Sequence, residues 1–531
     1  MNYRHDAPYP SRRSPVLARN VVTTSQPLAT QAGLSMLHRG GNAVDAILAT
    51  AITLTVVEPT GNGLGSDAFC ILWDGKELHG LNASGKSPKG WTPERFAGRK
   101  AMDERGWESV TVPGAVSAWV ALSERFGKLD FPTLFEPAIR YAEEGFLVSP
   151  IIGTLWRLGG DLLGHQPGFA DHFLPGGKAP APGAVFKSAA LARTLRLIAE
   201  TEGEAFYRGE LAERIAAWAK KHDAALDEDD LAAHEPYWCG TIHQGFRDVQ
   251  LHEIPPNGQG ISALMALGML EHAGIDRYEV DSADALHLQI EAMKLAFRDL
   301  KAYVADPGHM RDVTAKDLLS ADYLASRAKL IDPRRATDFK AGAPKAGGTV
   351  YLSAGDESGM MVSYIQSNYS GFGSGVVVPE TGISLQNRGS GFSLTPGHPN
   401  EVGPAKRPFH TIIPGFLMKG GEPLMSFGVM GGPIQPQGHV QMTLRTQLWD
   451  QDPQTSADAP RWRVMEGLDV AIEAAAGDDV LNELAARGHK VTRETADATS
   501  FGFGGAQLVH KVEGGYAAGS DPRKDGQAAG F

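Results

Sequence analysis

The chain has 531 residues, of which 42% are hydrophobic and 21% charged, and its formal charge is −12. These values are ordinary for a globular protein with a large buried core. Lys and Arg do not cluster beyond pairs such as Arg12-Arg13, which argues against nucleic acid or an anionic membrane as a partner.

The first residues contain no apolar segment that resembles a signal peptide. The longest apolar run, residues 46–57, is too short to span a bilayer. Cys70 and Cys239 are far apart, so we expect neither a disulfide framework nor a paired-cysteine metal site. The sequence predicts a cytoplasmic protein with no cofactor and no metal, and leaves the formation of a homo-oligomer open.

The first predicted elements are a buried helix over residues 40–57, entered through Gly-Gly-Asn, and an apolar strand over residues 67–75. From about residue 184 to 330 the pattern is mostly helical, with Ser282 and Ser320 where N-caps are wanted. Apolar residues recur at spacings of three and four in residues 190–201, 209–222, 282–304 and 320–331.

Residues 333–348 carry Pro and Gly without periodicity and are interpreted as a linker. Short β patterns follow it. They are residues 349–353, 360–367, 375–379 and 410–418. A helix-rich part, a linker and a strand-rich part usually mark a domain boundary.

Several familiar motifs are absent or lie in the wrong context. Residues 60–67, TGNGLGSD, follow a helix and precede a strand, whereas a nucleotide loop follows a strand and opens a helix. Residues 255–260, PPNGQG, are interpreted as a tight turn. No G-x-S-x-G or H-E-x-x-H occurs, and none of the 17 histidines is predicted to lie at metal-binding spacing from a carboxylate on a helix.

Thr349 begins a strand directly after Gly347 and Gly348. The simple interpretation is a β-branched residue opening a strand. The chemical interpretation is a nucleophile, because a threonine hydroxyl can be activated by its own α-amine once the preceding bond is cut. The two glycines lack Cβ, so the scissile carbonyl can bend towards the hydroxyl at little steric cost.

The hairpin after Thr349 suggests a second hydroxyl. If residues 355–359 form the turn, its centre lies near Glu357 and Thr349 faces about Ile365. Ser367 is then a diagonal neighbour on the same face of the hairpin, within reach of Thr349.

Eight stretches along the chain occur in a characteristic order. They are GGNAVDA (40–46), VPGAVSAW (112–119), YAEEGF (141–146), FYRGELAERI (206–215), EAMKLAFRD (291–299), FGSGVVVPETGISLQN (372–387), VMGG (429–432) and SDPRKDG (520–526). Through these stretches the chain resembles the γ-glutamyltransferase family of N-terminal-nucleophile hydrolases almost end to end. Singly each is modest, but their order is highly specific.

The resemblance implies an α+β fold, a four-layer αββα sandwich formed jointly by two processed subunits. Cleavage after Gly348 would give a large subunit, residues 1–348, and a small subunit, residues 349–531, that begins with the nucleophile Thr349. The two would remain one structural domain, so the apparent domain boundary becomes a processing site.

The resemblance also implies roles for single residues. Ser367 matches the hydroxyl that holds the new α-amine, and Gly431 and Gly432 match the pair whose N–H groups form the oxyanion hole. The reaction would be attack on an amide carbonyl, an acyl-threonine ester, and release to water or an acceptor amine.

Five positions depart from the family pattern. The arginine that binds the substrate α-carboxylate aligns with Ser84, and the aspartate that binds its α-amine aligns with Gly391. A Ser-Ser pair aligns with His410-Thr411, and an asparagine with Tyr369. Lys86 or Arg388 are the alternative cations, and both also fit solvated turn residues. Tyr369, Arg388, His410, Thr411 and Lys86 are therefore the predicted substrate-binding residues.

These departures are similar to the branch with γ-glutamyltransferase-like proteins and oxamate amidohydrolase. The leading hypothesis is an autoprocessing hydrolase or acyl transferase for γ-glutamyl amides such as glutathione. The alternative is an amidohydrolase of a small carboxylated amide such as oxamate, or an acylase. A non-catalytic binding relative is a third hypothesis, against which the presence of Thr349, Ser367 and the glycine pair argues.

Overall fold

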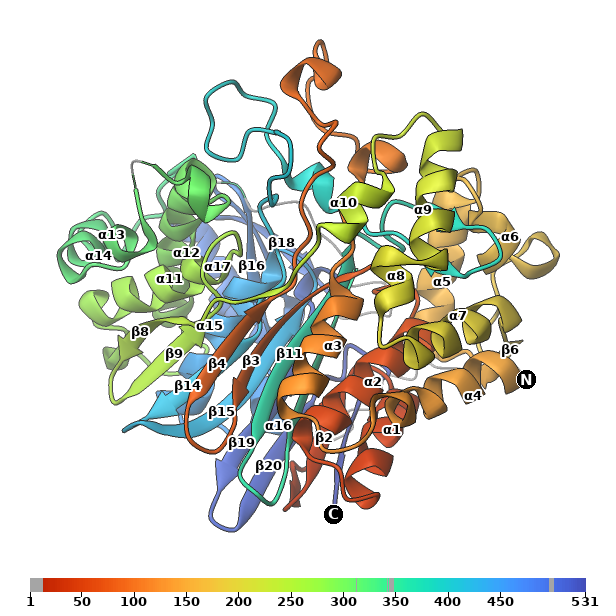
Figure 1. The fold of residues 1–531 in the computed structure, drawn as a ribbon. Helices are drawn as coiled ribbons and strands as arrows, with labels where there is room; N and C mark the ends of the chain where they lie inside the picture. The colour runs from red at the N-terminus through yellow and green to blue at the C-terminus, as the bar shows by residue number, and fades with distance from the viewer. Residues whose placement is uncertain (1–12, 312, 341, 343–347, 496–500) are drawn as a thin grey trace.

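The computed structural model describes residues 13–311, 313–340, 342, 348–495 and 501–531 (Figure 1). Two seven-stranded sheets form the centre of the fold, named here the β10 sheet and the β15 sheet. In spatial order the β10 sheet contains β21 (Gln527–Gly530), β2 (Val21–Thr24), β10 (Gly348–Gly355), β11 (Met361–Tyr369), β3 (Asp67–Trp73), β4 (Leu78–Asn82) and β7 (Tyr237–Trp238). The β15 sheet contains β1 (Val16–Ala18), β20 (Gly515–Ser520), β19 (Gly505–Val512), β15 (Glu422–Met430), β14 (Gly415–Lys419), β9 (Val249–Glu253) and β8 (Ile242–Phe246).

Both sheets combine strands from before and after Thr349. In Figure 1 the orange-red strands β3 and β4 lie beside the teal β11, and β11 pairs with β3 in antiparallel register. The helix-rich and strand-rich parts of the sequence are therefore interleaved within each sheet, and the predicted domain boundary does not separate two sets of strands.

Helices cover the outer face of each sheet, which gives the predicted αββα order of layers. The helices of the first half are α1 (Pro27–His38), α2 (Ala43–Val57), α3 (Ala115–Phe126), α4 (Glu136–Glu144), α5 (Pro150–Leu163), α6 (Phe169–Phe173), α7 (Ala189–Glu200), α8 (Glu204–Arg208), α9 (Glu210–Lys221) and α10 (Glu228–Ala232). Those of the second half are α11 (Gly260–Ala273), α12 (Ala283–Tyr303), α13 (Ala315–Leu318), α14 (Ala321–Ala328), α15 (Ile434–Gln447), α16 (Pro453–Asp458) and α17 (Asp478–Ala486).

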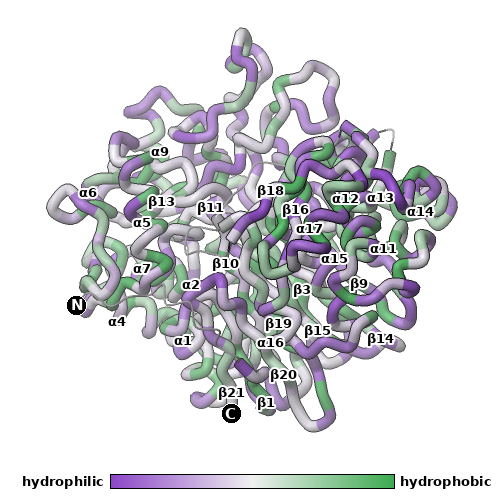
Figure 2. Tube along the Cα trace, turned by 180° about the vertical axis from the view of Figure 1, so that it is seen from behind, coloured by the Kyte–Doolittle hydropathy of each residue, from purple (hydrophilic) through white to green (hydrophobic). Residues whose placement is uncertain are grey.

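Three smaller sheets complete the described strands. They are β16–β17–β18 (Trp462–Glu466, Asp469–Glu473, Lys490–Glu494), β5–β6 (Phe146–Leu147, Val185–Phe186) and β12–β13 (Val377–Val378, Ile383–Ser384). Hydrophilic and hydrophobic stretches alternate along the outer helices in Figure 2, as expected for helices with one buried face. Within the described residues, none of the helices combines the length and apolar character that crossing a bilayer requires.

The apolar core divides along these layers. One cluster packs α2 against the outer face of the β10 sheet, and another packs α11 and α12 against the β15 sheet. A third cluster, with Phe69, Tyr351, Ile365 and Phe416, lies between the sheets. Alternate residues of β10 therefore face the helices and the second sheet, and Thr349 and Tyr351 share the inward face.

Most of the predicted helices are confirmed. The first begins at Asn42, whose side chain caps α2 in a reciprocal capping box with Asp45. Ser282 caps α12 as predicted, but the Ser320 hydroxyl donates to the Asp317 carbonyl and makes no cap bond.

Two strand predictions need correction. Between residues 184 and 330, the mostly helical prediction missed β8 and β9, an antiparallel edge hairpin whose alternating pattern is interrupted by histidines. The strand predicted from His410 begins only at Gly415, because the preceding residues bend to contact Asp67 and Asn257. In the predicted linker, residues 341 and 343–347, Gly347 among them, lie outside the described residues.

Candidate active site

The hairpin of β10 and β11 positions Thr349. Tyr351, not Thr349, faces Ile365, and the register becomes irregular only where Gly348 meets Tyr369. The predicted pairing was therefore wrong by two residues, because the turn lies one residue later than predicted and is centred on Ser358 instead of Glu357. A slip of two preserves which face each side chain occupies, so the predicted proximity of the two hydroxyls is nevertheless confirmed.

Two hydroxyl groups converge on the carbonyl before Thr349. Thr349 Oγ1 donates to the Gly348 carbonyl oxygen at 2.7 Å, and Ser367 Oγ donates to the same oxygen at 2.7 Å. The two hydroxyl oxygens are 3.1 Å apart, and the backbone N–H of Tyr369 donates to Ser367 Oγ at 2.8 Å. The Gly348 carbonyl oxygen thus accepts hydrogen bonds from two hydroxyl groups, which polarise the carbonyl. One of these hydroxyls, Thr349 Oγ1, lies beside the carbonyl group.

The glycine-rich segment 60–67 packs against this cluster, which explains its composition without a nucleotide. A Cβ on Gly61 would lie 3.3 Å from the carbonyl carbon and oxygen of Thr349, so the loop approaches β10 closely because that side chain is missing. The Gly61 carbonyl also accepts from the Asn368 N–H at 3.1 Å. The loop therefore supports the end of both hairpin strands.

Gly431 and Gly432 follow β15 directly and precede α15. Their φ angles are +123° and +73°, a region that side-chain-bearing residues rarely adopt. Across the two sheets, Ser353 Oγ lies 2.6 Å from Ser426 Oγ, and a Cβ on Gly428 would lie 2.4 Å from the Tyr351 ring. Thr349 lies two residues before Tyr351 on β10, and β15 ends two residues after Gly428, directly before the glycine pair. The cross-sheet contacts therefore run towards Thr349 on one strand and towards Gly431 and Gly432 on the other.

Gln259 is a positioning residue that sequence reasoning missed. The turn that contains it was interpreted only as a turn, yet its side-chain Nε2 donates to the carbonyls of Thr411, at 2.5 Å, and Gly432, at 2.9 Å. Gln259 is fully buried. It ties the glycine pair to the segment that carries the predicted substrate-binding residues. A polar residue between two glycines ahead of the apolar helix α11 was the available signal.

Arg388 is a buried cation. Its side chain is 1% exposed, Nη1 donates to Thr411 Oγ1 at 2.7 Å, and the guanidinium lies over the Tyr369 ring at 4.7 Å. Among the described residues, neither Nε nor Nη2 has a hydrogen-bond partner. Burial lowers the pKa of Arg388 to about 10, so it stays charged at neutral pH.

Tyr369 connects this cation to the hydroxyl pair. It ends β11 with φ at +77°, an uncommon conformation for an aromatic residue, while its N–H bonds Ser367. Backbone strain of this kind persists where surrounding contacts enforce it, and it concentrates at functional sites. The strained residue therefore links the Ser367 hydroxyl on one side to Arg388 on the other.

His410 does not offer a free side chain. Its Nε2 lies 2.9 Å from Asp67 Oδ2, and both residues are fully buried. Burial, with Arg388 nearby, holds the pKa of His410 well below its usual range. Burial raises the pKa of Asp67 to about 7, against the opposing effect of Arg388.

Lys86 occupies a different environment. It is exposed and lines a cavity of about 440 Å³ together with His234, Tyr237 and Arg407. Neither Thr349 nor Ser367 lines that cavity. Of the two cations predicted as replacements, the geometry groups Arg388, and not Lys86, with Thr411 and Tyr369.

Comparison with known proteins identifies the family. The family described as Gamma-glutamyltranspeptidase matches residues 29–531. The chain belongs to this family. It is 36% identical over 533 residues to the Glutathione hydrolase-like YwrD proenzyme of Bacillus subtilis strain 168, covering 98% of this chain and 100% of that protein. It is 35% identical to the Oxamate amidohydrolase proenzyme of Klebsiella pneumoniae subsp. pneumoniae, covering 98% and 99% of the two chains.

A solved structure is similar over the full length. The cephalosporin acylase from Bacillus halodurans superposes with a TM-score of 0.95 at 46% identity, covering 100% of this chain and 99% of that one. This γ-glutamyltranspeptidase-family protein is therefore an autoprocessing hydrolase with the sandwich fold of the N-terminal-nucleophile enzymes, as the resemblance implied.

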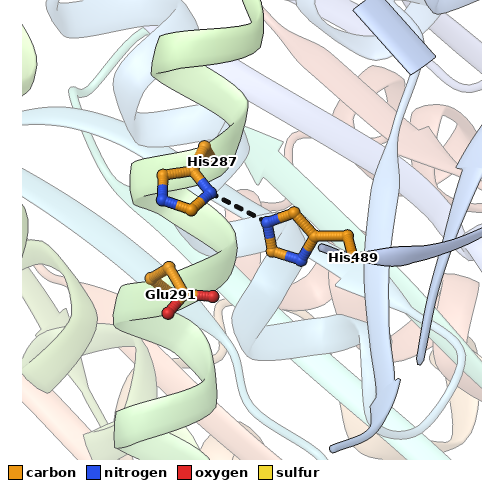
Figure 3. A group of neighbouring side chains, drawn as sticks. All are labelled: His287, Glu291 and His489. Carbon is orange, nitrogen blue, oxygen red and sulfur yellow. Dashed lines mark hydrogen bonds between the residues drawn. The ribbon is translucent and has the colours of Figure 1, made fainter. Parts of the chain in front are cut away.

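Elsewhere in this family member, three buried side chains have the spacing of metal ligands. His287 and Glu291 lie one turn apart on α12, and His489 approaches from the segment before β18 (Figure 3). The prediction that no histidine has such spacing was wrong. The groups are nevertheless engaged already: His287 Nδ1 and His489 Nε2 are 2.8 Å apart, and Glu291 forms an ion pair with Lys294. We interpret the cluster as structural.

The cluster fastens the start of the segment that leads to Thr349. His287 Nε2 bonds the Asp332 carbonyl at 2.7 Å. Glu291 accepts from the Thr337 N–H at 3.1 Å, and Lys294 donates to the Thr337 carbonyl at 2.8 Å. The chain is therefore held against α12 at Asp332, directly before the predicted linker, and at Thr337 within it.

Removal of one partner of this buried ion pair tests the structural interpretation. We expect Lys294→Met to lower the free energy of unfolding by about 3–5 kcal/mol, since it leaves the Glu291 carboxylate buried and unpaired. The double variant Glu291→Leu/Lys294→Met, measured by urea denaturation, should recover most of the loss. A rise in Tm with added Zn²⁺ that disappears in His489→Ala would identify a metal site instead.

Proposed function

We propose that this protein cleaves itself before Thr349 and then hydrolyses amides whose acyl group carries a carboxylate. The single observation that carries the substrate class is Arg388, a buried guanidinium with two nitrogen atoms unpartnered in the described residues. A buried charge without a partner is costly, and a carboxylate matches the planar guanidinium fork. The binding of such an anion would offset this cost.

Self-cleavage would begin from the geometry of the intact chain. Thr349 Oγ1 attacks the Gly348 carbonyl carbon while Ser367 donates to the carbonyl oxygen, and as the C–N bond breaks the proton of Oγ1 passes to the Thr349 nitrogen, which gives an ester and a free α-amine. Water then hydrolyses the ester. The products are residues 1–348 and a second chain that begins at Thr349.

The released amine would then serve as the base of the catalytic cycle. It takes the proton of Thr349 Oγ1 as this oxygen attacks the substrate amide, and gives it to the departing amine. Ser367 holds the amine, and the N–H groups of Gly431 and Gly432 stabilise the oxyanion. The acyl-threonine ester is finally released to water or to an acceptor amine.

The names of the relatives refer to several different substrates. One is named glutathione hydrolase-like and one oxamate amidohydrolase, and the similar solved structure is a cephalosporin acylase. A γ-glutamyl group carries a carboxylate and an α-ammonium, whereas oxamate carries the carboxylate alone. Gly391 stands where the family's amine-binding aspartate is expected, and both oxygens of Asp67 are already bonded, to His410 and Gly114. This supports acyl groups without an α-ammonium.

Three anilides that differ by one group each test the proposal. Butyryl, glutaryl and γ-glutamyl p-nitroanilide add first a carboxylate and then an α-ammonium to the same chain length, and oxamate is assayed by ammonia release. We expect kcat/KM for glutaryl anilide to exceed that for butyryl anilide by roughly a hundredfold, as a charge-assisted contact predicts. Glutaryl anilide should also equal or exceed γ-glutamyl anilide.

Two results would count against the proposal. Equal kcat/KM for butyryl and glutaryl anilides would remove the role of the carboxylate. A strong preference for γ-glutamyl over glutaryl anilide would mean that an acceptor for the α-ammonium exists, and would restore glutathione-like amides as the substrate.

A further inference from the structure

Asp67 continues the row of hydroxyl residues across the β10 sheet. In the antiparallel pairing of β11 with β3, Ser367 is directly opposite Asp67, and Ser367 Oγ in turn contacts Thr349 Oγ1. Directly paired residues point to the same face, so the three side chains project towards the β15 sheet from neighbouring strands. The row ends at a buried carboxylate.

The hydrogen bonds of His410 identify its tautomer. Its Nδ1 accepts from the Ile412 N–H at 3.3 Å, so the ring proton lies on Nε2 and is donated to Asp67 Oδ2. Asp67 also accepts from the backbone N–H groups of Gly114, at 3.1 Å, and Gly85. In the free protein the pair therefore consists of a neutral imidazole and a carboxylate that accepts three N–H groups.

The surroundings of the pair contain few other charges. The positive charges of Arg388 and Arg407 lower the pKa of Asp67, and the negative charge of Asp67 raises the pKa of the Tyr207 phenol. Arg388 also acts on His410. The Asp67 carboxylate is thus a through-space counter-charge to a guanidinium whose Nε and Nη2 have no hydrogen-bond partner in the part of the chain that the structure describes.

We propose that the Asp67–His410 pair takes up one proton when the carboxylate of a substrate binds to Arg388. This inference rests on the proposed function. Before binding, one buried negative charge balances one buried positive charge; after binding, two negative charges share a single guanidinium. Like charges close together in a water-poor site disfavour joint ionisation, so one proton joins the pair. The proton is shared between the carboxylate and the imidazole, so its uptake is assigned to the pair and not to either residue.

The proposal gives carboxylate binding a definite pH dependence. The pKa of Asp67 in the free protein is raised to about 7, so near neutral pH part of the population is already protonated. Above that pH the proton must come from solvent during binding, and the dissociation constant of a carboxylate rises with pH. The maximal rise approaches tenfold per pH unit, which is the signature of one linked proton.

The test measures proton uptake directly in the mature enzyme. Glutarate, ionised at both carboxylates at pH 7.5, is titrated calorimetrically in two buffers of different ionisation enthalpy. We expect the binding enthalpy to differ between buffers by an amount that corresponds to net uptake of up to one proton. In Asp67→Asn, which mimics the protonated carboxylate, we expect no uptake, and glutarate affinity that no longer falls between pH 7 and 8.5.

Each outcome decides between the proposals. Binding of glutarate without any buffer dependence of the enthalpy overturns the proton linkage but leaves the carboxylate site intact. Failure of glutarate, succinate and oxamate to bind at all overturns the proposed function, and the linkage with it. Undiminished uptake in both Asp67→Asn and His410→Gln, a second variant should the first not fold, would mean that another group takes the proton.

Discussion

Thr349→Ala is expected to accumulate as a single uncut chain and to lose at least about a thousandfold of its amidase activity, because one hydroxyl serves both reactions. In the intact protein this oxygen already contacts the Gly348 carbonyl that it must attack. Without it, neither the ester nor the free α-amine can form. A denaturing gel followed over days, intact mass and anilide turnover give the measurement.

Two matched controls separate chemistry from folding. Thr349→Ser keeps the hydroxyl and should cleave, more slowly because it lacks the methyl group that orients the oxygen. Ser367→Ala keeps the nucleophile and removes one of the two donors to the Gly348 carbonyl, so cleavage should slow without being abolished. Turnover by Thr349→Ala, or a mature second chain that begins elsewhere, would show that a different residue is the nucleophile.

The side chains on the inward face of the hairpin could be predicted, because successive residues of a strand point to opposite faces and an error of two residues leaves the face unchanged. The turn after β10 lies one residue later than predicted, which shifts the strand pairing by two, yet Thr349 and Ser367 still share a face and touch. An error of one residue would have placed them on opposite faces. Local sequence thus sufficed for the hydroxyl pair.

The proposed carboxylate site at Arg388 could not be derived in the same way. Arg388, Thr411 and Gln259 come from three separate segments, and only the tertiary fold brings them together. Lys86 and Arg388 carry the same charge and both follow turn-forming residues, so sequence alone left them equivalent. Burial distinguishes them: Lys86 is exposed and Arg388 is enclosed.

The hairpin of β8 and β9 was missed for a related reason. β8 alternates only weakly in burial, and although β9 alternates clearly it has just five residues, with Gln250 and His252 at its less buried positions. β8 lies at the edge of the sheet beside β9, which in turn pairs with β14, and the pattern of an edge strand is weaker than that of a buried strand such as β11. The helical spacing of apolar residues on either side of this hairpin led to the mostly helical prediction for residues 184–330.

Arg388→Met is expected to separate activity from stability. Truncation of one partner of a buried charge pair costs about 2–5 kcal/mol in binding, which is roughly a 30-fold to several thousandfold loss of kcat/KM for glutaryl anilide. Turnover of butyryl anilide should remain within about threefold of the parent protein, because no carboxylate is involved. Arg388→Lys, which keeps the charge but not the planar fork, should be intermediate.

The stability of the same variant is the stronger test of what Arg388 does. In the described residues its Nε and Nη2 bond nothing, so a methionine of similar length removes a buried charge that the free protein does not pair directly. We therefore expect Tm to stay constant or to rise, while kcat/KM falls. A structural arginine would give the opposite result, since its loss would lower Tm and affect both anilides alike. Retention of activity towards glutaryl anilide in a stable Arg388→Met protein would place the carboxylate elsewhere.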